Sequence, residues 1–233
     1  MKNRLGVLSA GIFAVPFVSV LTGSVVRFLR PWSRLEVDEV AGWGLRPSTH
    51  RARAYARQHG LPYVALEDGF LRSFGTGDRF PPLSLVVDDE GIYYDNTRPS
   101  ALETLLNSPA DLLGAQAEVV CGARMQLLDL CLSKYNHAPD LPKTALRADD
   151  VSRVLVIDQT AGDMSVALGG ASADTFAAML AAARAENPQA TIYVKTHPEV
   201  TSGRKGGYLT QVQDDERTVV LRQAINPLSL IER

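Results

Sequence analysis

Apolar and polar positions fall in blocks along the chain, and the most sharply bounded block is the run VLVI at residues 154–157. A continuous apolar run that stops at polar residues and glycine is typical of a strand buried on both faces, as in a parallel sheet. The next eight residues, DQTAGDMS, hold two carboxylates, an amide and two hydroxyls. Ligands of open α/β sheets bind beyond the carboxyl ends of the strands, so this segment is the first candidate site. The alternative is that Asp158 and Asp163 serve to cap a helix and close a turn.

The blocks on either side of this strand predict an alternation of strands and helices. The first half is expected to hold a strand at 37–43, a helix between Pro47 and Gly60, and a strand at 62–66. The second half continues after the central strand with a helix at 173–186 and strands at 191–195 and 218–221. This alternation predicts the α/β class, with two doubly wound, Rossmann-type parallel sheets and right-handed crossovers.

A polar linker around residues 144–150 divides the chain into two expected domains, residues 1–143 and 151–233. The first domain is expected to contain a hairpin that turns at residues 88–91 and a long helix over residues 110–132. The second is expected to be incomplete, because its last helix has barely one turn before the sequence stops.

The segment at residues 5–26 contains no charged side chain and follows Lys2 and Arg4. One interpretation is a signal peptide or a short membrane span, which would make the protein a secreted envelope protein. The other is the first strand of the α/β domain at residues 5–8, a turn at 9–11 and a short buried helix. The glycines, the serines and Pro16 within the segment favour the second interpretation.

Composition and charge are those of an ordinary globular protein, with 45% apolar and 21% charged residues. The net charge of -2 gives no electrostatic footprint for a nucleic acid. Cys121 and Cys131 lie on the same expected helix, about 15 Å apart, so they cannot form a disulfide and favour a reducing compartment. The four histidines are scattered and no CxxC is present, so no metal site is expected.

Four polar clusters lie at strand ends or in the adjoining loops. They are Glu67-Asp68 with Arg72-Ser73, residues 133–136, residues 158–165, and Lys195 with His197. Two sheets that face each other across a cleft would bring such ends together, which is the usual layout of a nucleotide-sugar enzyme. Lys195 and His197 are the best candidates for binding phosphate, because both donate hydrogen bonds. The alternative for His197 is a structural histidine.

Glu67 and Asp163 are a pair of carboxylates from different loops, which suits glycosyl transfer. One would attack or stabilise the anomeric centre while the other moves a proton. In a retaining mechanism their carboxyl groups should face one cleft, about 5–9 Å apart. The alternative for Glu67-Asp68-Gly69 is an Asp-Gly turn. The sequence contains neither GxGxxG after its first strand nor GxxxxGK[ST], which disfavours dinucleotide and P-loop sites.

Six ordered motifs resemble those of the capsule polysaccharide β-Kdo transferase family. They are WGLRPS (43–48), LEDGFLRS (66–73), PPLSLVVDDEGIYYD (81–95), SKYNHAP (133–139), DQTAGDMS (158–165) and KTHPEV (195–200). The resemblance covers nearly the whole chain. It implies a GT-B-like fold and the transfer, with retention, of the sugar acid Kdo from CMP-Kdo to a lipid-linked acceptor. In the second half, Asp163 would be the catalytic nucleophile. In the first half, Glu67 would be the acid/base.

The resemblance also implies a set of substrate-binding residues. Lys195 and His197 would lie near the CMP phosphate or the Kdo carboxylate. The remaining substrate-binding residues would be Arg72, Ser73, Lys134, Tyr135, Asn136, Gln159, Thr160 and Ser165. No cofactor is implied beyond the donor substrate.

The implied partners are CMP-Kdo, a lipid-linked glycerophosphate or Kdo acceptor, and proteins of capsule assembly. The implied location is the cytoplasm, with peripheral contact to the inner membrane. Two positions depart from the family pattern. Glu199 occupies a position where the family often has Asp. The sequence stops at Arg233, where the family continues into more of the donor site and a second module. The runner-up interpretation is therefore an inactive fragment that serves as a binding or scaffold module. An exposed apolar patch at residues 219–221 and 228–231 would favour it.

Overall fold

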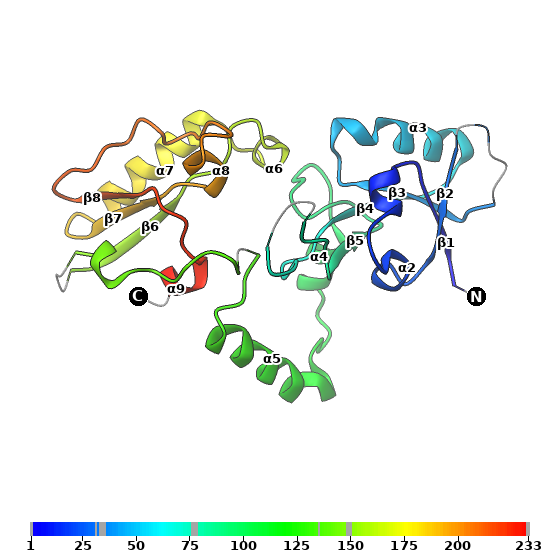
Figure 1. The fold of residues 1–233 in the computed structure, drawn as a ribbon, viewed down its shortest axis with the longest axis horizontal. Coiled ribbons are helices and arrows are strands. Elements are labelled where there is room, and N and C mark those ends of the chain that lie inside the picture. Colours follow the sequence, from blue (N-terminus) through cyan, green and yellow to red (C-terminus); the bar gives the residue numbers. More distant parts are fainter. Residues whose placement is uncertain are drawn as a thin grey trace. The chain divides into compact units, whose positions relative to one another are not determined.

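The computed structural model of the protein describes residues 2–30, 32, 36–75, 79–134, 136–147 and 151–231 (Figure 1). The chain forms two compact units, Met1–His137 and Ala138–Arg233. Residues 138–143, which we expected in the first domain, therefore belong to the second unit. Leu141 shows why, since its buried side chain packs against Tyr193 and Leu221 in the core of that unit.

The first unit is built on a five-stranded sheet with the order β2-β1-β3-β4-β5. Its strands are β1 (Arg4–Val7), β2 (Val25–Phe28), β3 (Glu39–Trp43), β4 (Tyr63–Asp68) and β5 (Leu85–Asp88). The first four are parallel, and β5 pairs antiparallel with β4. Since β2 lies on one side of β1 and β3 on the other, the topological switch of the sheet falls between β1 and β3.

Helices cover both faces of this sheet, as alternate side chains of the strands require. On one face, Leu5 and Val7 of β1 pack in a core with α1 (Ala10–Phe13) and α2 (Val18–Leu21). On the other face, Val40 of β3 packs with Ala52 and Ala56 of α3 (His50–His59). The unit also contains η1 (Pro47–Thr49), α4 (Ala101–Leu106), η2 (Gly114–Gln116) and α5 (Ala117–Asp129).

The second unit is built on a parallel three-stranded sheet with the order β6-β7-β8. Its elements are η3 (Lys143–Ala145), β6 (Arg153–Ile157), α6 (Met164–Leu168), α7 (Ala173–Glu186), β7 (Thr191–Lys195), α8 (Pro198–Thr201), β8 (Thr218–Leu221) and α9 (Pro227–Ile231). All five residues of the central strand β7 are buried. Ile192 and Val194 face a core with α7, while Tyr193 faces a core on the opposite side of the sheet.

The α/β class and the parallel sheets in both halves are confirmed, and the apolar segment 5–26 adopts its strand-and-helix interpretation. Its first strand is β1, in the interior of the sheet. The sequence prediction placed a turn at residues 9–11, where α1 begins at Ala10, and it missed that the same segment also runs into β2. Within the described residues, none of the helices combines the length and the apolar character that a membrane crossing requires.

Two local predictions for the first unit were wrong. The expected hairpin is absent, because Leu85–Asp88 pairs with β4 and Ile92 is fully buried in a turn. The helix expected over residues 110–132 is shorter and spans Ala117–Asp129 after a 3-10 turn. Cys131 therefore lies beyond its end, in a left-handed conformation with φ of 49°. Neither Cys121 nor Cys131 is in a disulfide.

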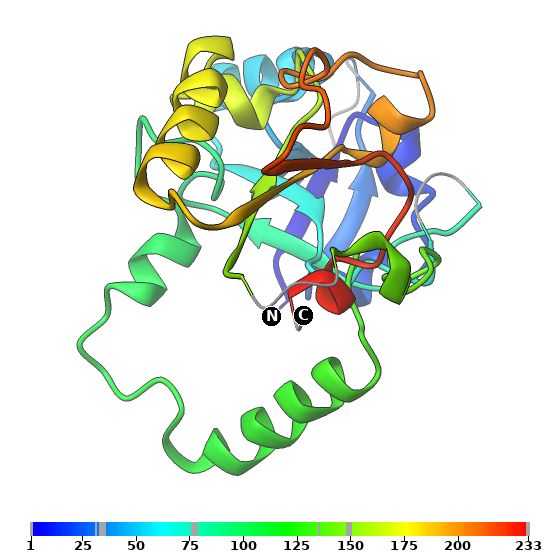
Figure 2. The ribbon, with the colours of Figure 1, turned by 90° about the vertical axis from the view of Figure 1, so that its left-hand side faces the viewer.

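Two helices of the first unit, α4 and α5, have no buried residue, and α5 is the longer of the two. The helix α5 carries the exposed side chains Val119, Val120, Met125 and Leu128. In the two ribbon views it lies apart from the strands of its own unit (Figures 1 and 2). Among the described residues, α5 therefore does not contribute to a core.

Candidate active site

The sites predicted from the sequence form two clusters, one at the carboxyl ends of the parallel strands of each unit. In the first unit, Glu67 and Asp68 are the last residues of β4. In the second, Asp158 follows β6, and Lys195 is the last residue of β7. Because the two units are separate bodies, the distance between Glu67 and Asp163 stays a prediction, as does the cleft between the sheets.

Glu67 is 7% exposed and its carboxylate is held by three donors. Its Oε1 accepts hydrogen bonds from the Trp43 indole at 2.9 Å and from the backbone N–H of Asp68 at 3.1 Å. The Arg46 guanidinium lies 3.6 Å from the same oxygen. All three contacts hold Oε1 in place, so the carboxylate has a fixed position, which is the arrangement that general-base catalysis uses.

Trp43 and Arg46 belong to the WGLRPS motif, but reasoning from the sequence did not assign them a role. Their role follows from the pairing of β3 with β4, which brings the motif next to Glu67. The parallel register places Trp43 opposite Leu66, so its side chain is one residue from Glu67 across the ladder. Gly44, with φ of 53°, is needed beside them because a Cβ there would lie 2.0 Å from the Tyr94 hydroxyl. That hydroxyl accepts a hydrogen bond from the backbone N–H of Leu45 at 3.1 Å.

Asp68 brings the second predicted motif next to the first. Its two carboxylate oxygens bind different cations, Arg72 Nε at 2.7 Å and Lys134 Nζ at 3.4 Å. Arg72 is 8% exposed and also donates to the carbonyl oxygens of Gly75 and Phe80, so it braces the loop that follows β4. The side chain of Lys134 is 40% exposed and so is accessible to a ligand.

Ser73 and Asn136 join these loops through hydrogen bonds of their own. The Asn136 amide donates to the backbone oxygen of Ser73 at 2.9 Å, and its Oδ1 accepts from the backbone N–H of Ser133 at 2.5 Å. The Ser73 hydroxyl donates to the Gly75 carbonyl at 3.1 Å. Five of the six predicted residues of this unit thus lie in one connected cluster, and Tyr135 lies outside the described residues.

In the second unit, Asp163 is an exposed carboxylate at the N-cap of α6. Its Oδ1 accepts hydrogen bonds from the backbone N–H of Ser165 at 2.9 Å and from the Ser165 hydroxyl at 2.8 Å. Its Oδ2 lies 3.5 Å from the hydroxyl of Thr160, which is a longer contact. The capping alternative is therefore correct in geometry, yet it leaves the carboxylate at the surface and oriented by its own helix.

Gln159 and Thr160 belong to the same loop as Asp163, and hydrogen bonds fix this loop in place. Thr160 is 1% exposed and pairs as an isolated β-bridge with Gly207. The backbone N–H of Gln159 donates to Asp158 Oδ1 at 2.9 Å, while its side chain is half-buried. The two loops that flank this strand end, around residues 158–163 and 199–209, are therefore fastened together.

Lys195 and His197 add two nitrogen groups to the same strand edge. Lys195 is 8% exposed, its ammonium donates to the Thr196 carbonyl, and burial lowers its pKa. His197 caps α8, and its Nδ1 accepts from the backbone N–H of Glu199 at 3.1 Å, so the neutral ring carries its proton on Nε2. Burial lowers the pKa of His197, against the opposing effect of the Glu199 carboxylate.

Asp163 is close enough to His197 for its charge to raise the pKa of that imidazole slightly. Glu199 in turn forms a 2.8 Å ion pair with Lys205, which is the largest cause of its own lowered pKa. A carboxylate, an imidazole and an ammonium thus gather at one sheet edge. Among the described residues, no three His, Cys, Asp or Glu side chains come together as metal ligands do.

Comparisons with known proteins agree with this architecture. The family model "Capsule polysaccharide biosynthesis protein" matches residues 38–138 and 122–233. The capsule polysaccharide modification protein LipA of Neisseria meningitidis serogroup B is 49% identical over 228 residues, which are 96% of this chain and 32% of LipA. The lipopolysaccharide-processing protein LpsZ of Rhizobium meliloti is 38% identical over 167 residues, which are 70% of this chain and 37% of LpsZ.

Two solved structures show the same fold. Thermosulfurimonas dismutans KpsC, beta Kdo 2,4 transferase, matches with a TM-score of 0.86 and 44% identity, over 100% of this chain and 72% of that one. The beta Kdo 2,7 transferase of the same organism has a TM-score of 0.57 and 21% identity, over 96% and 68% of the two chains, and supports the fold alone. The chain spans about a third of the length of the curated relatives it matches. With the family model matched from residue 38 to residue 233, the chain belongs to the capsule polysaccharide biosynthesis protein family.

Proposed function

We propose that this chain is the catalytic part of a retaining glycosyltransferase that moves Kdo from CMP-Kdo to a lipid-linked acceptor in capsule biosynthesis. The observation that carries the proposal is the gathering of Asp163, His197 and Lys195 at the carboxyl edge of the second sheet. A nucleophilic carboxylate beside hydrogen-bond donors is what displacement of a phosphate from a sugar requires. The 44% identity to a solved Kdo transferase supports the choice of sugar.

The first step is attack by Asp163 on the anomeric carbon of Kdo. Oδ1 takes the two short hydrogen bonds from Ser165, so Oδ2 is the oxygen we assign to the attack. A covalent bond forms between Oδ2 and the anomeric carbon as the bond to the phosphate of CMP breaks. The negative charge that develops on the departing phosphate is stabilised by Lys195 and by the Nε2–H of His197. No separate cofactor is needed for this step, since CMP is itself the leaving group.

The second step returns the enzyme to its starting state. A hydroxyl of the acceptor attacks the same anomeric carbon, the bond to Asp163 breaks, and the proton of the hydroxyl passes to Glu67, which then releases it to water. Two displacements at one carbon give net retention. Lys134, beside Asp68 and 40% exposed, is available for an anionic group of the substrate. We infer that the protein works in the cytoplasm, where CMP-Kdo is its donor, and meets its lipid acceptor at the inner membrane.

The test is a transfer assay with freshly prepared CMP-Kdo and a Kdo-primed acceptor, together with intact-mass detection of the covalent Kdo adduct. Asp163→Asn should abolish the adduct and lower transfer by about 10³-fold or more, because a neutral amide is a far weaker nucleophile. Asp174→Asn, in the first turn of α7, removes a carboxylate from a different helix start and should leave both readouts unchanged.

Transfer or an adduct that persists in Asp163→Asn would sink the proposed mechanism. If the folded wild-type chain gives neither transfer nor an adduct, the runner-up is favoured, which is a binding or scaffold module of capsule assembly. The apolar patch that we expected for that alternative is small. Ile231 is 68% exposed, whereas the rest of residues 219–221 and 228–230 is buried or half-buried.

A further inference from the structure

A cavity lies at the carboxyl edge of the first sheet, where no predicted site residue had placed a ligand. It has a volume of about 340 Å³ and is lined by Leu8, Phe28, Leu29, Arg30, Trp32 and Arg51. Leu8 follows β1, Phe28 ends β2, and Arg51 is the second residue of α3. The remaining lining residues, Leu29, Arg30 and Trp32, come after β2. The cavity therefore sits at the edge where the topological switch of the sheet falls, the place where open α/β sheets bind ligands.

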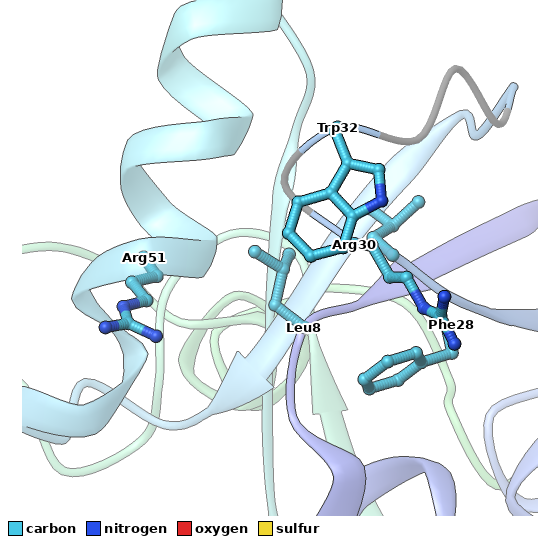
Figure 3. Close-up of a pocket in the computed structure, with 6 residues that line it drawn as sticks. Leu8, Phe28, Arg30, Trp32 and Arg51 are labelled. Carbon is cyan, nitrogen blue, oxygen red and sulfur yellow. The ribbon is translucent and has the colours of Figure 1, made fainter.

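The lining combines two cations with aromatic surface. Figure 3 shows Arg51, on α3, and Arg30, beyond β2, on either side of Trp32 and Leu8. The six lining residues include no carboxylate. The Trp32 side chain is 77% exposed, and Phe28 is anchored by a ring contact with Phe13 at 5.7 Å between centroids. An exposed indole beside guanidinium groups suits a ligand that has both an apolar face and a negative charge.

We propose that this cavity binds the anionic group of the acceptor, a sugar carboxylate or a glycerol phosphate, with the indole of Trp32 against its carbon skeleton. The inference rests on the proposed function, because it assigns the cavity to the acceptor of that reaction. Arg30 and Arg51, from opposite sides of Trp32 and Leu8, each supply charge-assisted hydrogen bonds to the anionic oxygens on their own side of the cavity. The volume suits one sugar residue or one glycerol phosphate.

The spacing of the strands connects this cavity to the general base. Leu8 follows β1 and Glu67 is near the end of β4, and β3 lies between these two strands. The Leu8 side of the cavity is thus two strand spacings from β4, about 10 Å, which is about the length of two linked sugar residues, and the Arg30 side, beyond β2, is one spacing farther. An acceptor held in the cavity by its charged group would therefore present a hydroxyl one residue further along to Glu67. The cavity selects an extended acceptor over a single sugar.

The two tryptophans of the chain allow a test of ligand binding, because one lies at the cavity and the other lies at Glu67. Trp32 lines the cavity, and the Trp43 indole donates to Glu67. In nitrogen-15 correlation spectra the two indole N–H signals, assigned with Trp32→Phe, report the cavity and the general base separately. The probes are the methyl glycoside of Kdo, which carries a carboxylate, and glycerol 3-phosphate. The neutral controls are the methyl ester of the same glycoside and glycerol.

We expect the Trp32 signal to shift at millimolar concentrations with one or both anionic probes and not with the neutral controls. Whether the carboxylate or the phosphate binds more tightly identifies the chemical source of the charge. Arg30→Gln and Arg51→Gln should each weaken binding by about tenfold, the effect of losing one charge-assisted hydrogen bond. Arg27→Gln on β2 and Arg57→Gln on α3 remove exposed cations of the same elements that are outside the cavity lining, and should bind like the wild type.

The inference is overturned if Trp32 does not respond, if the neutral ester binds as well as the acid, or if Arg30→Gln and Arg51→Gln bind unchanged. These outcomes are distinct from failure of the proposed function. The Asp163 adduct forms from donor alone, so an adduct with a silent cavity refutes this inference only. A responsive cavity without any adduct refutes the transferase mechanism and leaves an anion site.

Discussion

Two aspartates five positions apart in one loop have opposite surroundings. Asp158 is 2% exposed, and its Oδ1 accepts hydrogen bonds from the backbone N–H groups of Gln159, Tyr208 and Leu209 at 2.9, 3.0 and 3.2 Å. Asp163 is exposed and bound to its own helix start. Asp158 therefore holds the loop in place, and Asp163 is the one that we propose as the nucleophile.

The structural role of Asp158 has a measurable consequence. Asp158→Ala leaves three backbone donors without their acceptor and should lower the free energy of unfolding of the second unit by about 2–4 kcal/mol. Asp158→Asn keeps an oxygen acceptor and should cost less. Urea unfolding followed by circular dichroism provides the measurement, with the exposed Asp174→Ala as the matched control. An unfolding midpoint for Asp158→Ala equal to that of the wild type would contradict this role.

His197 connects the proposed donor site to the pH dependence of stability. Burial holds its folded pKa below the ordinary value of 6.5, so the folded state favours the neutral ring while the unfolded chain binds the proton. The stability that His197 contributes is therefore complete above pH 6.5 and is lost as the pH falls through its folded pKa. The slope from one such group is at most about 1.4 kcal/mol per pH unit.

Urea unfolding of the wild type and of His197→Gln between pH 5 and 8 checks this, because the variant should lack that part of the acid destabilisation. The matched control is His59→Gln, which removes an exposed imidazole at the end of α3. Proton NMR of the imidazole signals provides the direct measurement. If His197 titrates above 6.5, the assigned burial of its neutral form is wrong.

At the scale of elements, the sequence predicted those whose pattern is unambiguous. The run TIYVK is a strand with every residue buried, as expected of a parallel interior strand. The strand β2 was missed, because periodicity cannot separate a four-residue strand from a buried helix within a long apolar segment. The hairpin failed for a tertiary reason: the antiparallel partner of β5 is β4, which is distant in sequence.

The places of the candidate residues at strand ends were predictable from the sequence, but their contacts were not. Strand ends and motifs pointed to Glu67 and Asp163, and both lie at carboxyl edges of their sheets. The pattern could not show that Arg72 is bound to Asp68 and to two loop carbonyls, so its role as a substrate ligand stays a prediction. It also gave no sign of the cavity at Trp32, since that cavity depends on which strands are neighbours.

At the scale of the whole molecule, two sheets with separate cores are joined in sequence through a helix that buries nothing. The helices α5 and α7 are similar in length, with 13 and 14 residues, but Phe176 and Leu180 of α7 are buried in a core. A helix of this length without tertiary packing is marginal in water. The difference between the two helices is therefore a difference in packing and not in length.

Hydrogen exchange followed by mass spectrometry should show this difference directly. The amides of β1, β3, β4 and β7 should exchange slowest, because these strands lie inside their sheets, and those of α7 should be protected as well. The amides of α5 should exchange orders of magnitude faster than those of α7, because opening α5 exposes no buried apolar surface. Equal protection of the two helices would contradict this picture and would mean that the exposed valines of α5 are covered in solution. Dilution then shows whether a second copy of the chain or another part of the same chain covers α5. Protection by a second copy falls as the protein concentration falls, whereas protection from within the chain does not.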